Sequence, residues 1–378
     1  MDKVYHFSAP GRTEIGGNHT DHQHGCVIAA AVDMETTAEV TLNGTNIIRV
    51  DSEGYKPVEI GLNDLSVKES EKNTTAALIR GVAAAFAQRG HKLAGFDAKV
   101  RSTVLPGSGL SSSAAFEVLI GRILNGLFAD NAVSAIEIAQ IGQYAENVYY
   151  GKPSGLMDQM ASSVGGLVFI DFADPQNPVV EKVDYDFAHS GYTLCTIDSG
   201  ADHADLTDEY AAMPIEMIKV AAFFGKEVLR EVDEQEFYAK IAEIRKETGD
   251  RAVLRALHYY DENARVLEQA AAIRGGDLPA FFDAVNRSGE SSWKLLQNVY
   301  ARPTEEQMAM GIELSRRFLH GDGAQRVHGG GFAGTIQAYV PLDRLDDYKK
   351  LMEDAFGPGS CTALMVRPEG AVMMPMEG

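Results

Sequence analysis

The chain has few basic residues for its length. It contains 34 Lys and Arg against 54 Asp and Glu among 378 residues, which gives a formal net charge of −20. Proteins that bind nucleic acids or anionic membranes present basic surfaces, so this composition disfavours both kinds of partner. A protein of this charge that handles phosphate groups has to neutralise them locally, with a metal ion, selected Lys or Arg side chains, or backbone amides.

Cysteine and long apolar runs are scarce as well. Cys26, Cys195 and Cys361 lie far apart, and none forms a Cys-x-x-Cys pair, so the spacing of a zinc site is missing. The first residues carry no apolar signal-peptide core, and no apolar run approaches the roughly 18 residues of a membrane helix. We expect reduced, buried thiols in a cytoplasmic protein.

Internal repeats and regular strand–helix–strand alternation are also absent, which favours an α+β fold. Strand patterns are expected over 26–42, 46–50, 96–100, 167–170, 192–198, 335–340 and 361–366. Helical patterns are expected over 74–89, 113–128, 134–149, much of 205–320, and 343–356. A change of composition near 175–195 predicts two domains, residues 1–185 and 186–378.

The chain lacks both common phosphate-binding fingerprints, the Walker A loop and the dinucleotide Gly-x-Gly-x-x-Gly. It has instead Leu-Pro-Gly-Ser-Gly-Leu-Ser-Ser-Ser-Ala-Ala at 105–115, followed by an apolar pattern at helical spacing. Gly107 and Gly109 allow backbone amides to approach a ligand, and the serines supply hydroxyls and a helix N-cap. The loop suits the phosphate tail of a nucleotide, although a turn that merely caps a core helix remains open.

Residues 11–25 form a polar, glycine-rich block that looks too hydrophilic for a core element. Its Asp, Asn and Arg side chains suit the paired hydroxyls of a sugar and a nearby phosphate. Two alternatives remain open at this point: a solvated loop, and a metal site made by His19, His22 and His24.

Two further segments carry candidate chemistry. Glu146 is expected at a helix end, and Asp158 follows in an apolar, glycine-bounded stretch, 155–160. One carboxylate could hold Mg²⁺, and the other could accept a proton or orient a hydroxyl. The glycine cluster 329–331 could bring the backbone close to another loop or to phosphate, or form a close-packed turn.

Together and in this order, these blocks resemble the GHMP small-molecule kinases, and within them the galactokinase family. The resemblance extends over most of the chain. It implies a two-domain α+β fold with the active site in the interdomain cleft, and transfer of the γ-phosphoryl group of ATP to the anomeric hydroxyl of galactose. The implied partners are ATP, Mg²⁺ and a small-molecule sugar; a monomer is expected, with an oligomer left open.

The resemblance also implies roles at matching positions. Asp158 corresponds to the catalytic aspartate and Arg12 to the arginine beside it. Ser113 and Glu146 correspond to Mg²⁺ ligands, with Ser112 as a neighbouring alternative. The expected substrate contacts are Asn18, His19, Thr20, Asp21 and Tyr210. The expected nucleotide cradle consists of Gly107, Ser108, Gly109, Leu110, Ser111, Ser112 and Ser113.

The sequence departs from the family pattern at several of these positions. Asn18 stands where the family usually has a glutamate that meets a sugar hydroxyl, and His22 stands where it usually has tyrosine. His328 and Ala333 replace the usual Thr and Gly of the third motif. A GHMP kinase of different or broader sugar scope, a non-catalytic sugar sensor, and a metal-dependent isomerase built on the histidines are therefore the alternatives.

Overall fold

The computed structural model describes residues 3–104, 109–152, 154–200, 206–300, 302, 304–332 and 334–374. Two compact units are each assembled from separated segments. The first contains Met1–Arg12, Ala30–Gly166 and Arg367–Gly378; the second contains Thr13–Ala29 and Leu167–Val366. Strands β1 (Val4–Gly16) and β2 (Cys26–Leu42) each contribute residues to both. The division at residue 185 that composition suggested stays a prediction.

Strand β1 overturns the expectation that residues 11–16 are too polar for the core. From Phe7 to Gly16 every residue of this strand is buried. The polar side chains are tolerated because each has a partner: Thr13 contacts Gln337 and His328, and Glu14 contacts Arg326. Buried polar groups that are hydrogen-bonded carry little penalty, so a polar sequence can form a core strand.

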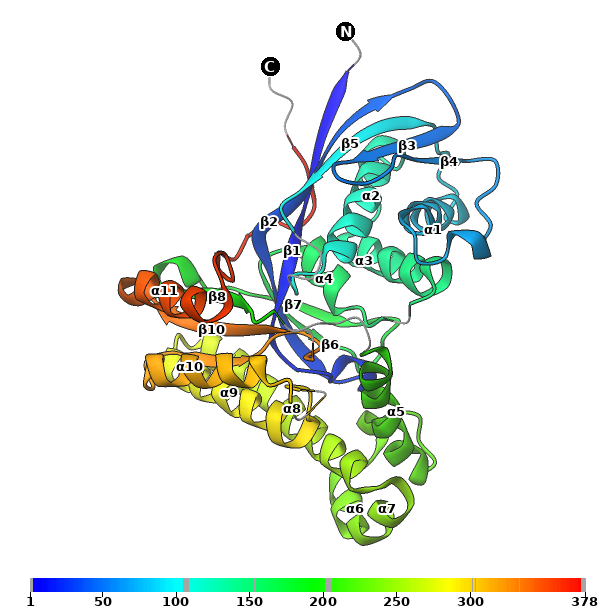
Figure 1. Cartoon of the computed structure of the whole chain (residues 1–378). Helices are drawn as coiled ribbons and strands as arrows, with labels where there is room; N and C mark the ends of the chain where they lie inside the picture. Colours follow the sequence, from blue (N-terminus) through cyan, green and yellow to red (C-terminus); the bar gives the residue numbers. More distant parts are fainter. Residues whose placement is uncertain are drawn as a thin grey trace. The chain divides into compact units, whose positions relative to one another are not determined.

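The first unit is a sheet covered by helices on one face (Figure 1). Its strand order is β12-β1-β2-β5-β3-β4, with β3 and β5 parallel. The remaining strands are β3 (Ile47–Ser52), β4 (Val58–Gly61), β5 (Phe96–Ser102) and β12 (Val372–Met373). The alternation predicted for β5 is confirmed, because Phe96, Ala98 and Val100 point into the core and the residues between them are exposed.

The α-helices in the described residues of this unit are α1 (Thr75–Gln88), α2 (Ser112–Phe128), α3 (Ala135–Tyr144) and α4 (Met157–Val164). Helix α3 ends five residues earlier than the predicted 134–149, because the chain widens into a π-helical turn, η3 (Ala145–Tyr150). Such turns hold an extra residue and are frequent at functional sites. The turn carries Glu146. A short 3-10 turn, η2 (Glu69–Glu71), precedes α1.

The second unit contains a four-stranded antiparallel sheet in the order β11-β8-β10-β9. These strands are β8 (Tyr192–Asp198), β9 (Ala324–Val327), β10 (Thr335–Pro341) and β11 (Cys361–Leu364). Alternate residues of β10 serve two layers. Tyr339 meets Phe281 edge-on, whereas Ile336 and Val340 lie in a core with helices α10 and α11. Strands β6 (Leu167–Asp171) and β7 (Val179–Val183) pair with each other, and β6 also pairs with β2.

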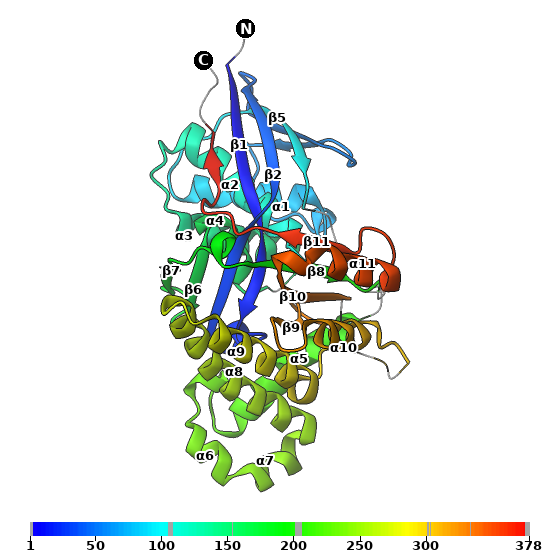
Figure 2. The ribbon, with the colours of Figure 1, turned by 90° about the vertical axis from the view of Figure 1, so that its left-hand side faces the viewer.

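The helices of this unit are α5 (Thr207–Phe223), α6 (Glu234–Ala239), α7 (Ile241–Thr248), α8 (Asp250–Arg274), α9 (Leu278–Ser291), α10 (Gln307–Leu319) and α11 (Leu345–Phe356). Shorter turns are η1 (Asp21–Gln23), η4 (Phe187–His189), η5 (Leu229–Glu231), η6 (Ser292–Leu296) and η7 (Leu342–Arg344). Figures 1 and 2 show α6 and α7 at the far ends of α5 and α8, away from the four-stranded sheet.

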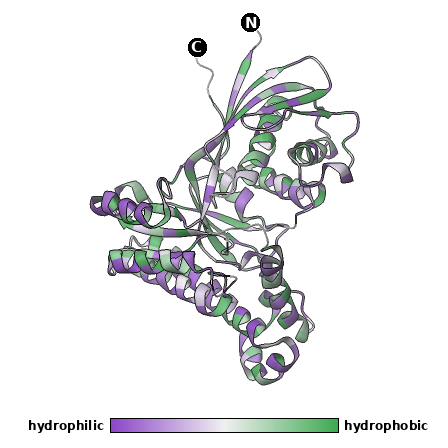
Figure 3. Cartoon of the chain, in the orientation of Figure 1, coloured by the Kyte–Doolittle hydropathy of each residue, from purple (hydrophilic) through white to green (hydrophobic). Residues whose placement is uncertain are grey.

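The long helices are amphipathic. Hydrophilic and hydrophobic residues alternate along α8 and α9 (Figure 3), and the buried positions of α8 recur at three- and four-residue intervals, as expected for helices with one face on a core. Within the described parts of the chain, no helix has the length and apolar character needed to cross a membrane.

Candidate active site

Arg12 and Asp158 come together although 146 residues separate them in sequence. Arg12 lies on β1, and Asp158 lies in the first turn of α4. The guanidinium donates from Nε to Oδ1 at 2.7 Å and from Nη2 to Oδ2 at 2.6 Å. This two-pronged pairing fixes the plane of the carboxylate, because both of its oxygens are held.

The start of α2 meets the same carboxylate. Ser111 Oγ donates to Asp158 Oδ2 at 2.7 Å, and Arg12 Nη1 donates to the Gly109 carbonyl. Of the three serines that were expected to supply an N-cap, Ser111 takes the N-cap position of α2, but its backbone is left-handed (φ 58°) and its hydroxyl does not make the expected capping bond. The hydroxyl is used for Asp158 instead, and amide groups of the first helical turn point outward at the positive end of the helix dipole.

The environment keeps Asp158 ionised and reachable. Burial raises the pKa of Asp158, but Arg12 and Ser111 lower it by more, so the pKa lies below its usual value. The side chain is still 30% exposed, whereas that of Arg12 is only 9% exposed. A carboxylate of this kind can accept a hydrogen bond from a hydroxyl group and is negatively charged at neutral pH.

Three side chains donate hydrogen bonds to the Glu146 carboxylate. Its Oε2 accepts from Ser154 Oγ at 2.6 Å and from Gln159 Nε2 at 2.9 Å, and Lys152 Nζ lies 3.3 Å from its Oε1. Gln159 Nε2 also donates to Glu117 Oε2 at 2.9 Å. Gln159 therefore joins the π-helical turn to helix α2.

Burial and the nearby Glu146 charge raise the pKa of Glu117 well above its usual value, which favours the protonated form of that fully buried side chain. We call Glu117, Glu146 and Asp158, with the Arg12, Lys152 and Gln159 side chains that contact them, the carboxylate cluster.

The carboxylate cluster offers oxygen donors of the kind that Mg²⁺ prefers. Glu117 lies one helical turn after Ser113 and so on the same face of α2, and Gln159 connects Glu117 to Glu146. The predicted ligands Ser113 and Glu146 are thus linked to one neighbourhood and offer the hard oxygen donors that Mg²⁺ prefers. Among the residues that the structure describes, no group of three or more His, Cys, Asp or Glu could hold a metal ion, so protein ligands alone would not complete a coordination sphere.

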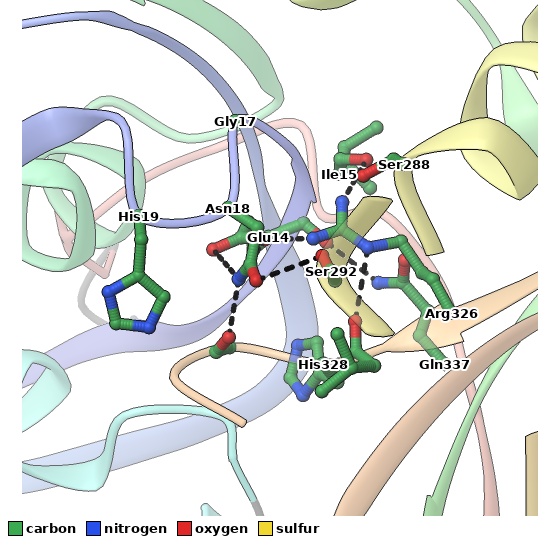
Figure 4. A network of polar contacts seen from close by, with 12 residues as sticks. Glu14, Ile15, Gly17, Asn18, His19, Ser288, Ser292, Arg326, His328 and Gln337 are labelled. Carbon is green, nitrogen blue, oxygen red and sulfur yellow. Dashed lines mark hydrogen bonds and ion pairs between the residues drawn. The ribbon is translucent and has the colours of Figure 1, made fainter. Parts of the chain in front are cut away.

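In the second unit, Asn18 is the centre of a buried polar network (Figure 4). Its side chain is fully buried, and every donor and acceptor on the amide is used. Nδ2 donates to the Gly329 carbonyl at 2.6 Å and to Glu14 at 3.1 Å, while Oδ1 accepts from Asn298 at 2.8 Å and from Ser292 at 3.2 Å. We call these residues, with Arg326 bound to Glu14, the asparagine network.

Each of the three backbone carbonyls of the glycine cluster accepts a hydrogen bond from a side chain. Asn18 donates to Gly329 O, His19 Nε2 to Gly330 O at 3.0 Å, and Tyr210 Oη to Gly331 O at 2.5 Å. A Cβ on Gly331 would lie 2.2 Å from the Asn298 carbonyl, so a side chain cannot be accommodated there. Three of the predicted sugar contacts thus hold the third motif.

His19 and His22 form a pair with defined tautomers. His19 Nε2 faces a carbonyl and must donate, so its Nδ1 accepts from His22 Nε2 at 3.2 Å; His22 Nδ1 accepts from Gln23 Nε2 at 3.2 Å. Burial lowers the pKa of His19 to about 4 and that of His22 well below its usual value. Both rings are neutral at pH 7.

The other predicted sugar contacts differ in exposure. Thr20 is buried and donates to the carbonyls of Gly17 and Cys26, whereas Asp21 and Tyr210 are partly exposed. Burial raises the pKa of Tyr210 to about 12, so its hydroxyl stays protonated. Gly107, Ser108 and Ala333 lie outside the described residues, as do residues 203–205.

Sequence patterns missed several residues of both sites. Lys152 and Asn298 carried no motif signal, and Glu262 and His258 looked like ordinary polar positions of a helix. Yet Glu262 accepts from the backbone amides of Gly17 and Asn18, and His258 contacts the Asn18 carbonyl at 2.9 Å. A signal existed only for Gln159, which follows Asp158 in the segment already singled out.

Comparison with known proteins agrees with this geometry. Residues 77–166 match the family model described as GHMP kinases N terminal domain, and residues 2–42 match the galactokinase galactose-binding signature. The crystal structure of Lactococcus lactis galactokinase complexed with galactose superposes with a TM-score of 0.85 at 22% identity, covering 98% of this chain and 95% of that one. The Methanococcus jannaschii mevalonate kinase superposes at 0.68, with 14% identity and coverage of 97% and 98%.

Curated relatives extend over nearly the whole chain. The galactokinase of Streptomyces coelicolor is 33% identical over 364 residues, covering 94% of this chain and 90% of that protein. That of Mannheimia succiniciproducens is 29% identical, with coverage of 92% and 88%. The fold and the glycine–serine start of α2 define a GHMP small-molecule kinase. Within that class, the chain belongs to the galactokinase family of ATP-dependent sugar kinases.

Proposed function

We propose that the protein transfers the γ-phosphoryl group of ATP to the anomeric hydroxyl of galactose, giving galactose 1-phosphate and ADP. The observation that carries this proposal is the two-pronged Arg12–Asp158 pair at the start of α2. An ionised carboxylate, a fixed cation and outward-pointing amides form the set of groups that phosphoryl transfer requires, because this reaction depends on positioning and charge stabilisation.

Asp158 accepts a hydrogen bond from the anomeric hydroxyl and keeps its oxygen in line with the γ-phosphorus. As the new P–O bond forms and the bond to ADP breaks, the hydroxyl becomes more acidic and its proton passes to Asp158. Arg12 holds the carboxylate in position and offsets charge on the moving phosphoryl group. The low pKa of Asp158 makes it a weak base before the P–O bond forms, so proton transfer is late.

The nucleotide phosphates would bind to the segment Gly109 to Ser113, which leads into the first turn of α2, with Gly107 and Ser108 as the other residues of the proposed cradle. Ser113 and Glu146 would hold Mg²⁺, with Ser112 as the alternative hydroxyl. Bound there, Mg²⁺ supplies charge neutralisation for the phosphate oxygens. Support comes from the link between Glu146 and α2 through Gln159.

Among the proposed sugar contacts, His19, Asp21 and Tyr210 present partly exposed side chains. Asn18 and Thr20 act indirectly, because they are fully buried and their polar groups are already used inside the protein. A broader sugar scope is the second candidate function. It is favoured by Asn18, whose saturated amide has no donor or acceptor left to test a sugar hydroxyl.

We further propose a cytoplasmic monomer. All three cysteines are free and buried, which suits a reducing compartment where ATP is available.

The test is a panel of hexoses, hexosamines, arabinose and heptoses incubated with ATP, with and without Mg²⁺, and followed by ADP release. Galactose should give the highest kcat/KM, and omission of Mg²⁺ should abolish turnover. Phosphorylation of other sugars with galactose untouched would refute the proposed substrate. ATP and galactose binding without any turnover would instead support a sugar sensor.

A further inference from the structure

Lys152 occupies a constrained place directly over Glu146. The amides of Gly151 and Lys152 both donate to the Glu146 carbonyl, at 3.0 and 3.1 Å, so the chain folds back after the π-helical turn. Gly151 adopts a left-handed conformation (φ 88°) that makes this reversal possible. As a result, Lys152 Nζ lies 3.3 Å from Glu146 Oε1.

The ammonium group is charged and open to solvent. The side chain is 61% exposed, in contrast to the 5% of Glu146 beneath it. Lys152 therefore presents a positive charge at the outer edge of the carboxylate cluster.

The carboxylate cluster carries negative charge that the Lys152 ammonium group would help to offset. Glu146 and Asp158 are carboxylates, and Glu117 lies behind them. Arg12 already donates to both oxygens of Asp158, from Nε and from Nη2. A nucleoside triphosphate would add several negative charges beside these carboxylates, in a protein of net charge −20. Like charges brought together in a protein repel one another, so a cation at the edge of the cluster would offset this repulsion.

We propose that Lys152 is an additional nucleotide-binding residue, whose ammonium group binds the β- and γ-phosphate oxygens of ATP while remaining beside Glu146. This inference rests on the proposed kinase function and deepens it. A lysine ammonium has three rotatable donors on a flexible stem. One donor can stay with Glu146 Oε1 while the others bind phosphate.

The experiment compares Lys152→Met with the matched control Lys350→Met. Lys350 is an exposed lysine that also pairs with an acid, Asp354, at 2.7 Å, far along the chain from the cluster. Dissociation constants for ATP, ADP and AMP are measured by calorimetry at low ionic strength, in EDTA and again with Mg²⁺. Circular dichroism and thermal melting verify that both variants fold.

In EDTA, Lys152→Met should weaken ATP binding by about 10- to 100-fold, the range expected for a charge-assisted hydrogen bond. ADP should be weakened less, and AMP binding should change by less than about twofold because AMP has no β- or γ-phosphate. Lys152→Arg should restore most of the ATP affinity, and Lys350→Met should match the wild type. Higher salt should reduce the difference between Lys152→Met and the wild type.

An ATP dissociation constant in EDTA within twofold of the wild type would overturn the proposal. So would a defect that is seen only with Mg²⁺ present, since Lys152 would then merely orient Glu146. A wild-type protein that binds no ATP under either condition would refute the proposed kinase function itself, and this inference with it.

Discussion

The two polar centres of the molecule are built on opposite principles. In the carboxylate cluster, like charges lie close together and the groups that meet solvent, Asp158 and Lys152, are partly exposed. In the asparagine network, the central group is a neutral amide with no exposed surface and no unused donor or acceptor. The first centre is left incomplete, whereas the amide at the centre of the second has all of its groups paired within the protein.

This difference separates residues that act on a ligand from residues that hold a shape. A site with unbalanced charges is stabilised when a ligand of complementary charge binds to it. A fully paired amide gains nothing from a ligand, but it fixes the backbone around it, since each of its buried groups would be costly to leave unpaired. Changes in the carboxylate cluster should therefore alter catalysis with little effect on folding, and changes in the asparagine network should do the reverse.

Asp158→Asn should give the largest effect on the rate. The amide is the same size but cannot accept the hydroxyl proton, so kcat should fall by about 1000-fold, within the range for loss of a general base. ATP affinity should stay near the wild-type value. Steady-state kinetics and calorimetry measure both, with Asp354→Asn as an exposed control; a kcat within tenfold of the wild type would remove Asp158 from its role.

Asn18→Asp should break the network instead. The carboxylate cannot donate to Gly329 O and would stand beside Glu14, which the Asn18 amide approaches at 3.1 Å. We expect the free energy of unfolding to fall by about 3 kcal/mol, from an unpaired carbonyl and a buried like-charge contact.

Denaturant titration tests this change in stability. Asn177→Asp is the control, because Asn177 is exposed and also lies beside an acid, Asp174. Equal stability of the two variants would contradict the comparison between the centres.

Gln159→Met is the intermediate case, because Gln159 belongs to the carboxylate cluster yet is fully buried. Its loss leaves Glu117 and Glu146 without their shared donor. We expect a decrease of about 2 kcal/mol in the free energy of unfolding and a higher Mg²⁺ concentration for half-maximal rate. Denaturation and Mg²⁺ titration check both, and an unchanged Mg²⁺ requirement would show that Gln159 does not orient Glu146.

Acid should affect the second unit before it affects Asp158. The folded pKa of His19 is lowered from 6.5 to about 4, and that of His22 is lowered as well. The folded state therefore binds fewer protons than the unfolded chain. Stability is fully present above pH 6.5 and is lost as the pH falls toward 4. Asp158, with its lowered pKa, stays ionised over most of that range.

The predicted loss is about 1 kcal/mol at pH 5.5, reduced from the full linkage value because His19 is partly exposed. Denaturation at pH 7.5 and 5.5 measures it. His22→Gln keeps a donor for His19 Nδ1 without a titrating ring. The variant should therefore lose less stability than the wild type between pH 7.5 and 5.5. An identical pH dependence in wild type and variant would exclude His22 as a contributor.

Local patterns predicted most elements of the fold. Strands such as β5 and helices such as α2 follow from alternation and helical spacing in a single stretch of sequence. Strand β1 was misjudged because its polar residues are satisfied by partners more than 300 positions away, such as Arg326 for Glu14. Strand β9 was not predicted for a similar reason, because the polar residues Gln325 and Arg326 interrupt its apolar pattern.

The site was predictable where its residues lie in motifs and not elsewhere. Arg12 and Asp158 were expected together because family resemblance linked two distant segments. Asn298 lies 280 residues from Asn18, and no periodicity connects them. Lys152 was missed because its position depends on the extra residue of the π-helical turn, which spacing rules for α-helices do not include.

That turn has an evolutionary consequence. Between Ala145 and Tyr150 the backbone accommodates one residue more than a regular helix would. Deleting any single residue there would restore ordinary helical spacing and rotate Glu146 by about 100° relative to the residues after the turn, out of reach of Gln159 and Ser154. Substitutions in this short stretch can accumulate gradually, but a change in its length displaces the Glu146 carboxylate in a single event, so related genes should differ here in residue type and not in length.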